Sequence, residues 1–447
     1  MNLATGIGYF LTFLLIIIFF GICYFILKHL GVLKPKVEQL TETDKPTGQP
    51  GFFHGLTTGI PRKLGLSENN FKLVFGMTTV VIASRVLIFL IGSMAIILFT
   101  NRAENIFNLF EFRWYKADSP LYINIAQNWY VNHGDDLFLI VFYPLYPILI
   151  AIVNFLVRNY IISGILVSTL SMIVACVYLY KLVNIDFDKQ VAFNAVKFLV
   201  IFPFSFFLGL VFSDSLFIAL TIMTFYYMRK RKWFLTGVLG GLASLTRNFG
   251  ILLLVPVAIE YFAETKFIEM LKEKNWKQIF SDLIKRGSNL LLIPLGQFTY
   301  LLINKVVTGN WLTFLTYQNQ HWCHELKLNV AANLGTHLTN ALTWKPADTA
   351  CMWAPLVILV FLIILMMFYA LGKIRISYIA YTFAYLFLCL TITWLISGGR
   401  YLMGIFPIYL ITALLARNRF SDLVLTLVFI LGLCCYTIAY VMGLYVY

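Results

Sequence analysis

The 447-residue sequence is 60% hydrophobic and only 12% charged, and its mean hydropathy is +0.82. An average soluble domain carries about twice that charged fraction, so the composition excludes an ordinary soluble protein. The formal net charge of +14 does not indicate nucleic-acid binding, because the basic residues form short clusters between apolar runs rather than a basic helix or an aromatic-basic surface.

The first apolar run, residues 8–26, is long enough for a transmembrane helix, which needs about 20 apolar residues. It has no basic n-region and no small-residue cleavage site, so we predict no cleavable signal peptide. The polar stretch that follows contains Lys, Pro and Gly, and we place it in the cytoplasm. Residues 1–71 are therefore expected to form an N-terminal helix and a cytoplasmic linker. The run 73–99 then crosses outward to an external loop at 100–136.

The next apolar segment, residues 137–157, is interrupted by Pro144 and Pro147. It is one of four apolar segments between the external loop and the basic run at 229–232, which should be cytoplasmic. An odd number of crossings must join these two sides, so one segment cannot span. Because prolines break a simple helix, we predict that 137–157 forms an interfacial or re-entrant helix on the outer face.

Ten further crossings follow in chain order. We predict them at residues 161–183, 191–211, 215–228, 233–246, 249–261, 290–303, 352–371, 378–396, 401–415 and 423–445. The expected fold is an all-α polytopic membrane protein with about 12 transmembrane helices and two large extracytoplasmic loops, at 100–136 and 304–351. Residues 72–417 form the main domain, and 418–447 a C-terminal transmembrane helix. In this topology 23 of the 34 Lys and Arg face the cytoplasm and nine face outward, which supports the orientation.

Two aspartates stand out at the predicted outer face. Asp118 precedes Ser119 and Pro120, a pattern typical of the start of a helix. Its carboxylate could cap that helix, or it could remove a proton from an acceptor hydroxyl at the membrane face. Asp214 lies between two serines at the outer end of two predicted helices, and the same two interpretations apply.

Three arginines are unusual in their positions. Arg247 and Arg400 lie at outer turns, against the positive-inside bias. A guanidinium suits phosphate oxygens, so anion binding would explain them; lipid-headgroup contact or a structural ion pair are the alternatives. Arg85 lies within a predicted span, where an arginine is costly, so we expect a partner in the bundle such as Asp214 or a phosphate ligand.

The second external loop contains residues that invite a metal site, namely His321, Cys323, His324 and His337. We do not favour one, because zinc sites need a closed ligand set with definite spacing. Cys323 and Cys351 fall in one external segment, where a disulfide could form. The aromatic and amide side chains of this loop would instead hold a sugar. No phosphate-binding loop, dinucleotide fingerprint or nucleophile elbow is present, so nucleotide-driven chemistry is not predicted.

Taken in order, these motifs resemble the bacterial branch of the PIG-V-like mannosyltransferase family, integral membrane proteins with a GT-C architecture. The family's first external loop reads Arg-Trp-Asp-Ser, with a Tyr four positions after the Asp, then Ile-Ala and a closing Gly-Tyr. The matching residues here are Asp118, Ser119, Tyr122, Ile125, Ala126, Tyr130, Phe142, Tyr143, Pro144 to Pro147, Ser213 to Phe217, Ser244, Arg247, Gly250, Gln320, Trp322, Arg400, Tyr401 and Pro407. This sequence departs from the family where 115–117 separate Trp114 from Asp118, and where Trp129 replaces the usual glycine.

The resemblance implies a GT-C-like catalytic bundle in a bacterial plasma membrane, with its active site on the extracytoplasmic face. It implies inverting transfer of mannose or another hexose from a polyprenyl-phosphate donor to a glycan or glycolipid, without a cofactor. Asp118 would be the general base, and Asp214 would orient the acceptor or, less favoured, a divalent cation. The donor phosphate would be bound by Arg247, Arg400 and Arg85. The substrate would be contacted by Trp114, Tyr122, Tyr143, Tyr146, Gln320, Trp322 and Tyr401.

Two other functions remain as alternatives. A lipid or solute transporter or flippase would have broken helices and ionisable residues near the bilayer midplane, often with inverted repeats. Only Arg85 is clearly mid-span, and the acidic residues gather at the outer surface. A catalytically silent subunit of a glycosyltransferase complex is the second alternative, because the family's Trp-Asp pair is split here.

Overall fold

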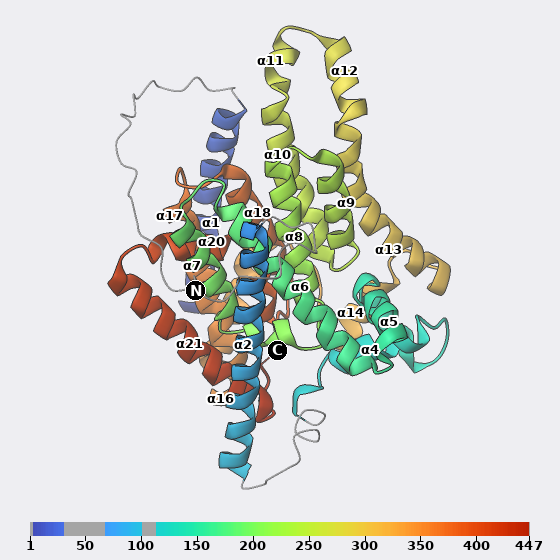
Figure 1. Ribbon diagram of the computed structural model, residues 1–447, viewed down its shortest axis with the longest axis vertical. Helices are drawn as coiled ribbons and strands as arrows, with labels where there is room; N and C mark the ends of the chain where they lie inside the picture. Colours follow the sequence, from blue (N-terminus) through green and yellow to red (C-terminus); the bar gives the residue numbers. More distant parts are fainter. Residues whose placement is uncertain (1–2, 31–67, 101–112, 447) are drawn as a thin grey trace.

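The computed structural model describes residues 3–30, 68–100 and 113–446, and helices dominate these residues (Figure 1). Within the described ranges no strand forms, and the one β-type pairing is an isolated bridge between Leu326 and Ile392. The predicted all-α fold is thereby confirmed. Most of the predicted cytoplasmic linker (31–67) and part of the first external loop (101–112) lie outside the described residues.

Within the described ranges, six helical segments are long and apolar enough to cross a membrane, which makes the chain an integral membrane protein. They are α1 (Leu3–His29), α2 (Glu68–Thr100), α6 (Tyr160–Val183), α13 (Leu292–Thr308) with η6 (Gly287–Leu291) before it, α17 (Ala354–Ala370) with α16 (Pro346–Asp348) and η7 (Thr349–Trp353) before it, and α21 (Arg419–Val441). The remaining elements are α4 (Ser119–Asn128), η3 (Asp135–Val141), α5 (Leu145–Val157), α7 (Lys189–Val200), η4 (Ser205–Gly209), α8 (Asp214–Arg229), α9 (Trp233–Ser244), η5 (Asn248–Leu253), α10 (Leu254–Glu264), α11 (Phe267–Lys272), α12 (Trp276–Lys285), α14 (Thr313–Trp322), α15 (Val330–Thr343), α18 (Ile376–Leu390), α19 (Gly398–Met403) and α20 (Pro407–Leu415).

The predicted count of about 12 spans is not confirmed. Six of the predicted spans are the long segments given above, and the other six fold as shorter or interrupted helices. The span expected at 191–211, for example, ends as α7 at Val200, and Pro203 follows before the short turn η4. Helix α8 has only 16 residues and is buried along most of its length. Its apolar composition therefore reflects packing inside the bundle rather than contact with lipid.

The segment expected to be broken, 137–157, is indeed broken. Helices η3 and α5 meet at an angle of 105° across residues 142–144. Pro144 is the residue just before α5, where its missing N–H leaves no hydrogen bond unmade. This bend places the two helices where they can frame the candidate site described below.

The segment predicted as the second external loop, 304–351, is largely helical. It contains α14 and α15, and α15 packs along α1. The two helices lie so close that a Cβ on Gly8 would be 2.6 Å from the carbonyl oxygen of Ala331. His337, one of the metal candidates, is buried inside this packing and stacks on the ring of Trp353.

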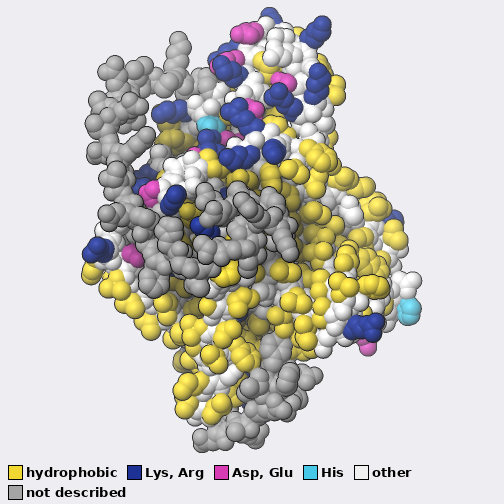
Figure 2. Space-filling model, viewed as in Figure 1, with side chains coloured by type: hydrophobic (Ala, Val, Ile, Leu, Met, Phe, Trp, Pro, Cys, Tyr) yellow, Lys and Arg dark blue, Asp and Glu magenta, His cyan; other side chains and the backbone are white. Residues whose placement is uncertain are grey.

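The two ends of the molecule differ in charge. Helices α11 and α12 project from one end (Figure 1), and basic side chains gather there (Figure 2). Apolar side chains cover the flank below this end (Figure 2). Large apolar side chains that are exposed include Phe75, Leu98 and Phe155. An apolar flank with a basic end is the pattern of a membrane protein whose basic end faces the cytoplasm.

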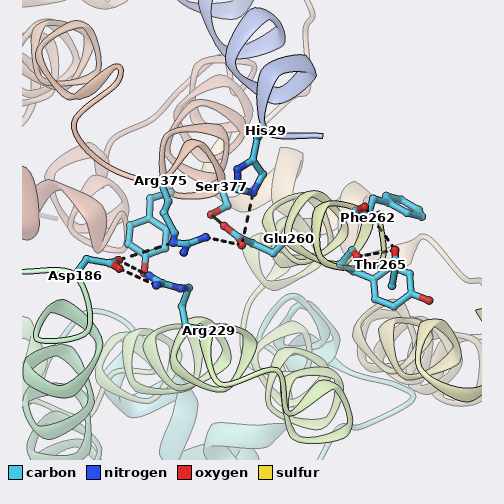
Figure 3. Close-up of polar contacts among 10 residues, drawn as sticks. His29, Asp186, Arg229, Glu260, Phe262, Thr265, Arg375 and Ser377 are labelled. Carbon is cyan, nitrogen blue, oxygen red and sulfur yellow. Dashed lines mark hydrogen bonds and ion pairs between the residues drawn. The ribbon is translucent and has the colours of Figure 1, made fainter. Parts of the chain in front are cut away.

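An ion-pair network ties several helices together near this basic end (Figure 3). Its members are His29, Asp186, Arg229, Glu260, Arg375 and Ser377. Arg229 binds both carboxylate oxygens of Asp186, with Nη2 to Oδ1 at 2.7 Å. Arg375 Nη1 lies 3.0 Å from Glu260 Oε2. The network therefore joins α1, α8, α10 and α18 to the turn that follows α6.

Candidate active site

Asp118 is placed at the start of α4, but its side chain does not cap that helix. Its backbone carbonyl accepts hydrogen bonds from the N–H groups of Leu121 and Tyr122, each at 3.1 Å. The carboxylate makes no capping hydrogen bond. Instead Oδ2 lies 2.7 Å from Nη2 of Arg400, which α19 brings to the same point. The carboxylate is thus turned toward an arginine that is 282 positions later in the chain, a charge-assisted contact.

Asp214 is the first residue of α8, and the N-cap residue before it is Ser213, whose side chain makes no capping hydrogen bond. Its Oδ1 accepts a short hydrogen bond from Nη1 of Arg247, and its Oδ2 lies 3.6 Å from Nε of Arg400. Only 3% of the Asp214 side chain is exposed. A carboxylate this deeply buried requires such partners, because an unpaired buried charge is costly.

Arg247 is held by a tight turn between α9 and η5. Gly250 packs directly on the end of α9, where an added Cβ would lie 2.3 Å from the backbone nitrogen of Ser244. The N–H of Gly250 donates to the carbonyl of Arg247 at 2.9 Å. The spacing Ser-x-x-Arg-x-x-Gly therefore has a steric basis: only glycine permits the close approach that presents Arg247 at the end of the bundle.

We refer to Asp118, Asp214, Arg247 and Arg400 as the charge quartet. Their side chains are 17%, 3%, 9% and 6% exposed, respectively, and their formal charges sum to zero. The guanidinium of Arg247 also lies 5.1 Å from the ring centroid of Tyr401. Cation–π contact and ion pairing together fix the arginines in a largely water-excluded place, where electrostatic interactions are strong.

Three members of the charge quartet, Asp118, Arg247 and Arg400, line a cleft, whereas the buried Asp214 pairs with the two arginines without lining it. The described residues that line this cleft are Asp118, Tyr122, Val141, Phe142, Tyr143, Thr246, Arg247, Asn248, Gln318, Trp322, His324, Arg400 and Tyr401. Four aromatic residues proposed from the sequence to contact substrate are among them. They come from α4, from the bend before α5, from α14 and from α19. The hydroxyl of Tyr122 is hydrogen-bonded to Ser213 Oγ at 2.8 Å, which fixes its ring beside the quartet.

Three other residues proposed to contact substrate lie outside the lining. Trp114 is buried, and it packs on the ring of Tyr440 with centroids 6.2 Å apart. Tyr146 is fully buried beneath the cleft, with its ring 5.1 Å from that of Tyr122. Gln320 is exposed on the outer side of α14. Any effect of these residues on substrate would pass through the neighbours that they support.

Arg85 has a partner other than the expected Asp214. Its Nη1 donates to the backbone carbonyl of Ser205 at 2.6 Å, and its Nε lies 3.3 Å from Ser84 Oγ. Ser205 belongs to the short turn η4, whose carbonyl groups are not all satisfied by an α-helical ladder. Arg85 therefore stabilises an interrupted helix, and it does not line the cleft with the other two arginines.

Gln318 and His324 are two of the six lining residues that were not predicted as site residues. Gln318 lies one helical turn before Trp322 on α14, so the two side chains share a face that Gln320 does not. Burial lowers the pKa of His324 to about 4, and a hydrogen bond with the backbone of Trp394 and the nearby charge of Asp118 oppose this shift only in part. His324 is therefore neutral at pH 7. Its buried Nε2 has no hydrogen-bond partner among the described residues.

The insertion that separates Trp114 from Asp118 is anchored on α21. Lys116 donates from Nζ to the carbonyl of Tyr440 and lies 4.2 Å from the centroid of that ring. Burial lowers the pKa of Lys116 to about 8. Ala117 has φ 57°, and Trp129, which stands where the resembled family has glycine, has φ 64°. Both values lie in the left-handed region that favours glycine, so the backbone on either side of α4 is strained.

The remaining metal and disulfide expectations can be compared with the structure. Among the described residues, no group of three or more His, Cys, Asp and Glu side chains is arranged to hold a metal ion. Cys323 and Cys351 are both free; Cys323 is exposed and Cys351 is buried.

Comparisons with known proteins gave matches to solved structures and to one family. ArnT from Cupriavidus metallidurans, in a structure bound to undecaprenyl phosphate, shares 12% identity at a TM-score of 0.45, over 83% of this chain and 75% of ArnT. The oligosaccharyltransferase of Archaeoglobus fulgidus in the apo form shares 12% identity at a TM-score of 0.42, over 82% of this chain and 56% of its own. The comparison with curated proteins found no match. Residues 143–284, which contain Asp214 and Arg247, match the sequence profile of a family described as dolichyl-phosphate-mannose-protein mannosyltransferase.

Proposed function

We propose that this protein is a GT-C-type membrane glycosyltransferase that moves a sugar from a polyprenyl-phosphate donor to an acceptor on the extracytoplasmic side. The observation that carries this proposal is the charge quartet, which pairs two carboxylates with two guanidinium groups and presents Asp118, Arg247 and Arg400 to an aromatic cleft. The match of residues 143–284 to a family named for a dolichyl-phosphate-linked mannose supports the donor class. Mannose or another hexose would be the sugar, and a glycan or glycolipid the acceptor.

In the proposed reaction Asp118 is the general base. The acceptor hydroxyl gives its proton to the Asp118 carboxylate while its oxygen attacks the anomeric carbon of the sugar. The bond between that carbon and the phosphate oxygen breaks, and the electron pair leaves with polyprenyl phosphate. Attack from the face opposite the leaving group inverts the anomeric configuration. Asp118 is the most exposed member of the quartet, which suits the group that must meet the acceptor.

The charge balance of the quartet suits this chemistry. The donor is a phosphodiester with one negative charge, whereas the departing polyprenyl phosphate gains a second. At the same moment protonation neutralises Asp118, so Arg400 loses the counter-charge that it held at 2.7 Å. Arg400 can then stabilise the leaving phosphate, together with Arg247. The arginines are thus better matched to the transition state than to the ground state, which is what accelerates a reaction.

Asp214 would orient the acceptor and keep both arginines in place. The sugar would lie against the aromatic side chains of Tyr122, Tyr143, Trp322 and Tyr401. The neutral His324 and the amide of Gln318 would hydrogen-bond its hydroxyl groups, since both line the cleft and neither carries charge at pH 7. These are the side-chain types that fix the orientation of a polar ligand in a site.

The extracytoplasmic location is supported by the asymmetry of the chain. The basic end with α11 and α12 should face the cytoplasm, and the cleft is built at the opposite ends of α8 and α9. A bacterial plasma membrane follows from the branch of the family that the motifs resemble.

Sugar transfer by the purified protein tests the proposal. The protein in lipid would be supplied with radiolabelled polyprenyl-phosphate mannose, glucose or galactose and with a cell-envelope extract as acceptor. Transfer by the wild type but not by a folded Asp118→Asn variant is the expected result, and the anomeric configuration of the product, read by NMR, should be opposite to that of the donor. Asp135→Asn is a matched control, because Asp135 is an exposed acidic residue in the same external region.

Each outcome separates one part of the proposal from the rest. Transfer by both Asp118→Asn and the wild type would support the glycosyltransferase activity but would show that Asp118 is not its general base. Transfer by neither, with donor and acceptor shown to be competent, would favour the transporter or the silent subunit.

A further inference from the structure

A second cavity, of about 1110 Å³, lies at the opposite end of the bundle from the charge quartet. It opens between the first turns of α2 and the ends of α6, α7 and α8. The described residues that line it are Asn70, Lys72, Leu73, Phe75, Gly76, Met77, Thr79, Val80, Tyr180, Lys181, Asn184, Ile185, Lys189, Phe193, Tyr226 and Lys230. The proposed sugar transfer makes no use of it.

The described charged side chains that line this cavity are all positively charged. Among the described residues that line it are four lysines and no carboxylate. Asp186, which follows α6, is already paired, because Arg229 binds both of its carboxylate oxygens (Figure 3). Lys189 and Lys230 are exposed. Lys181, Lys189 and Lys230 therefore give this cavity a positive charge that fits an anionic group.

The other wall of the cavity is apolar and faces outward. Phe75 on α2 and Phe193 on α7 are 49% and 42% exposed, and Leu73, Met77 and Val80 continue the apolar surface along α2. Helix α2 is itself one of the six segments long enough to span a membrane. Lys181 lies in the last turn of α6, another of these six segments. A lysine at the end of a spanning helix, beside the apolar residues of α2, matches the headgroup and acyl regions of a lipid leaflet.

We infer that this cavity binds one anionic phospholipid of the cytoplasmic leaflet. The phosphate group lies among Lys181, Lys189 and Lys230, and an acyl chain lies along α2 between Phe75 and Phe193. The occupant is distinct from a polyprenyl-phosphate donor, which reacts at the other end of the bundle. This inference does not depend on the proposed enzymatic function.

Native mass spectrometry of the delipidated protein in an uncharged detergent tests the inference. The protein is titrated with phosphatidylglycerol and, separately, with phosphatidylcholine of the same acyl chains. The wild type should retain one phosphatidylglycerol at least tenfold more tightly than phosphatidylcholine. Replacing the three lysines in K181Q/K189Q/K230Q should weaken phosphatidylglycerol binding about 100-fold, since each lysine near a membrane surface contributes roughly a factor of five. The matched control K272Q/K277Q/K285Q removes the same charge from α11 and α12 outside the cavity, and it should change binding less than twofold.

A steric variant separates a bound lipid from diffuse surface charge. Gly76 lines the cavity, and a Cβ placed on it would meet no described atom within 4 Å. Gly76→Trp should therefore fill the cavity and abolish the selective binding of phosphatidylglycerol without disturbing the helix packing. Gly76→Ala should leave this binding intact. Equal losses in the two triple variants would overturn the inference, and so would unchanged binding to Gly76→Trp. Displacement of the lipid by millimolar glycerol 3-phosphate would also overturn it, because the site would then take the phosphate group alone.

Discussion

Substitutions of Asp214 and Arg247 should have strongly coupled effects on the free energy of unfolding, and a double-mutant cycle can measure this coupling. The two side chains are only 3% and 9% exposed, and Arg400 Nε lies 3.6 Å from the second oxygen of Asp214. Asp214→Asn leaves two buried guanidinium groups with Asp118 as their remaining carboxylate in the quartet. Breaking a buried pair in this way costs about 3–5 kcal/mol in the free energy of unfolding. Arg247→Gln should cost less, about 2–3 kcal/mol, because Asp214 keeps its contact with Arg400.

The double variant D214N/R247Q restores a neutral site. Its loss of stability should therefore be smaller than the sum of the two single losses by about 2–3 kcal/mol. Reversible unfolding in one fixed detergent, followed by intrinsic fluorescence, gives the three free energies. The exposed pair Lys266–Glu269, with side chains 70% and 54% exposed, serves as the control and should show a coupling below about 0.5 kcal/mol. Losses that add to within about 0.5 kcal/mol at Asp214 and Arg247 would refute the reasoning.

Three further predictions concern the surroundings of the quartet. Ala117→Gly should raise the free energy of unfolding by about 0.5–1 kcal/mol in the same assay, because Ala117 has φ 57°, and an unchanged value would show that the strain is absent. Gly250→Ala should lower sugar transfer at least 100-fold, because its Cβ would lie 2.3 Å from the Ser244 nitrogen and displace the turn that holds Arg247; full activity would contradict this account. His324 should titrate near pH 4 by NMR. Between pH 6.5 and 4, His324 therefore binds more protons in the unfolded chain than in the folded protein. The wild type should therefore lose up to about 1.4 kcal/mol of stability for each pH unit of acidification in this window, a slope that His324→Gln should reduce; equal slopes would argue against a buried, neutral His324.

Hydropathy predicted where helices form, but not how many of them span. Helix α8 illustrates the reason, since most of its residues pack against protein, yet its sequence is apolar enough that residues 215–228 are predicted to span the membrane. Apolar composition does not distinguish the two environments, because protein interior and lipid both exclude water. The proline-broken segment around Pro144 was predictable, since proline removes a backbone donor whatever its surroundings.

For the site, the sequence predicted the individual residues but not how they pair. Asp118, Asp214, Arg247 and Arg400 were each predicted at the outer face, and the structure brings them within ion-pairing distance. Their pairing could not be predicted, because the four residues are spread over nearly 300 positions and meet only when the bundle is closed.

Arg85 and Gln320 differ from their predicted roles for physical reasons that the sequence does not reveal. The partner of Arg85 is a backbone carbonyl in an interrupted helix, which no side chain in the sequence reveals. Gln318 replaces Gln320 in the cleft because α14 turns one face inward, and the sequence had been interpreted there as a loop.

The neutrality of the charge quartet has a consequence for how the donor arrives. A cleft with a net charge would attract or repel ions over a Debye length, about 8 Å at physiological ionic strength, and its KM would change with added salt. Two aspartates and two arginines present no such long-range field. A lipid-linked donor already diffuses laterally in the bilayer beside the protein and needs no electrostatic steering, so the KM for this donor should stay nearly constant from low to high ionic strength.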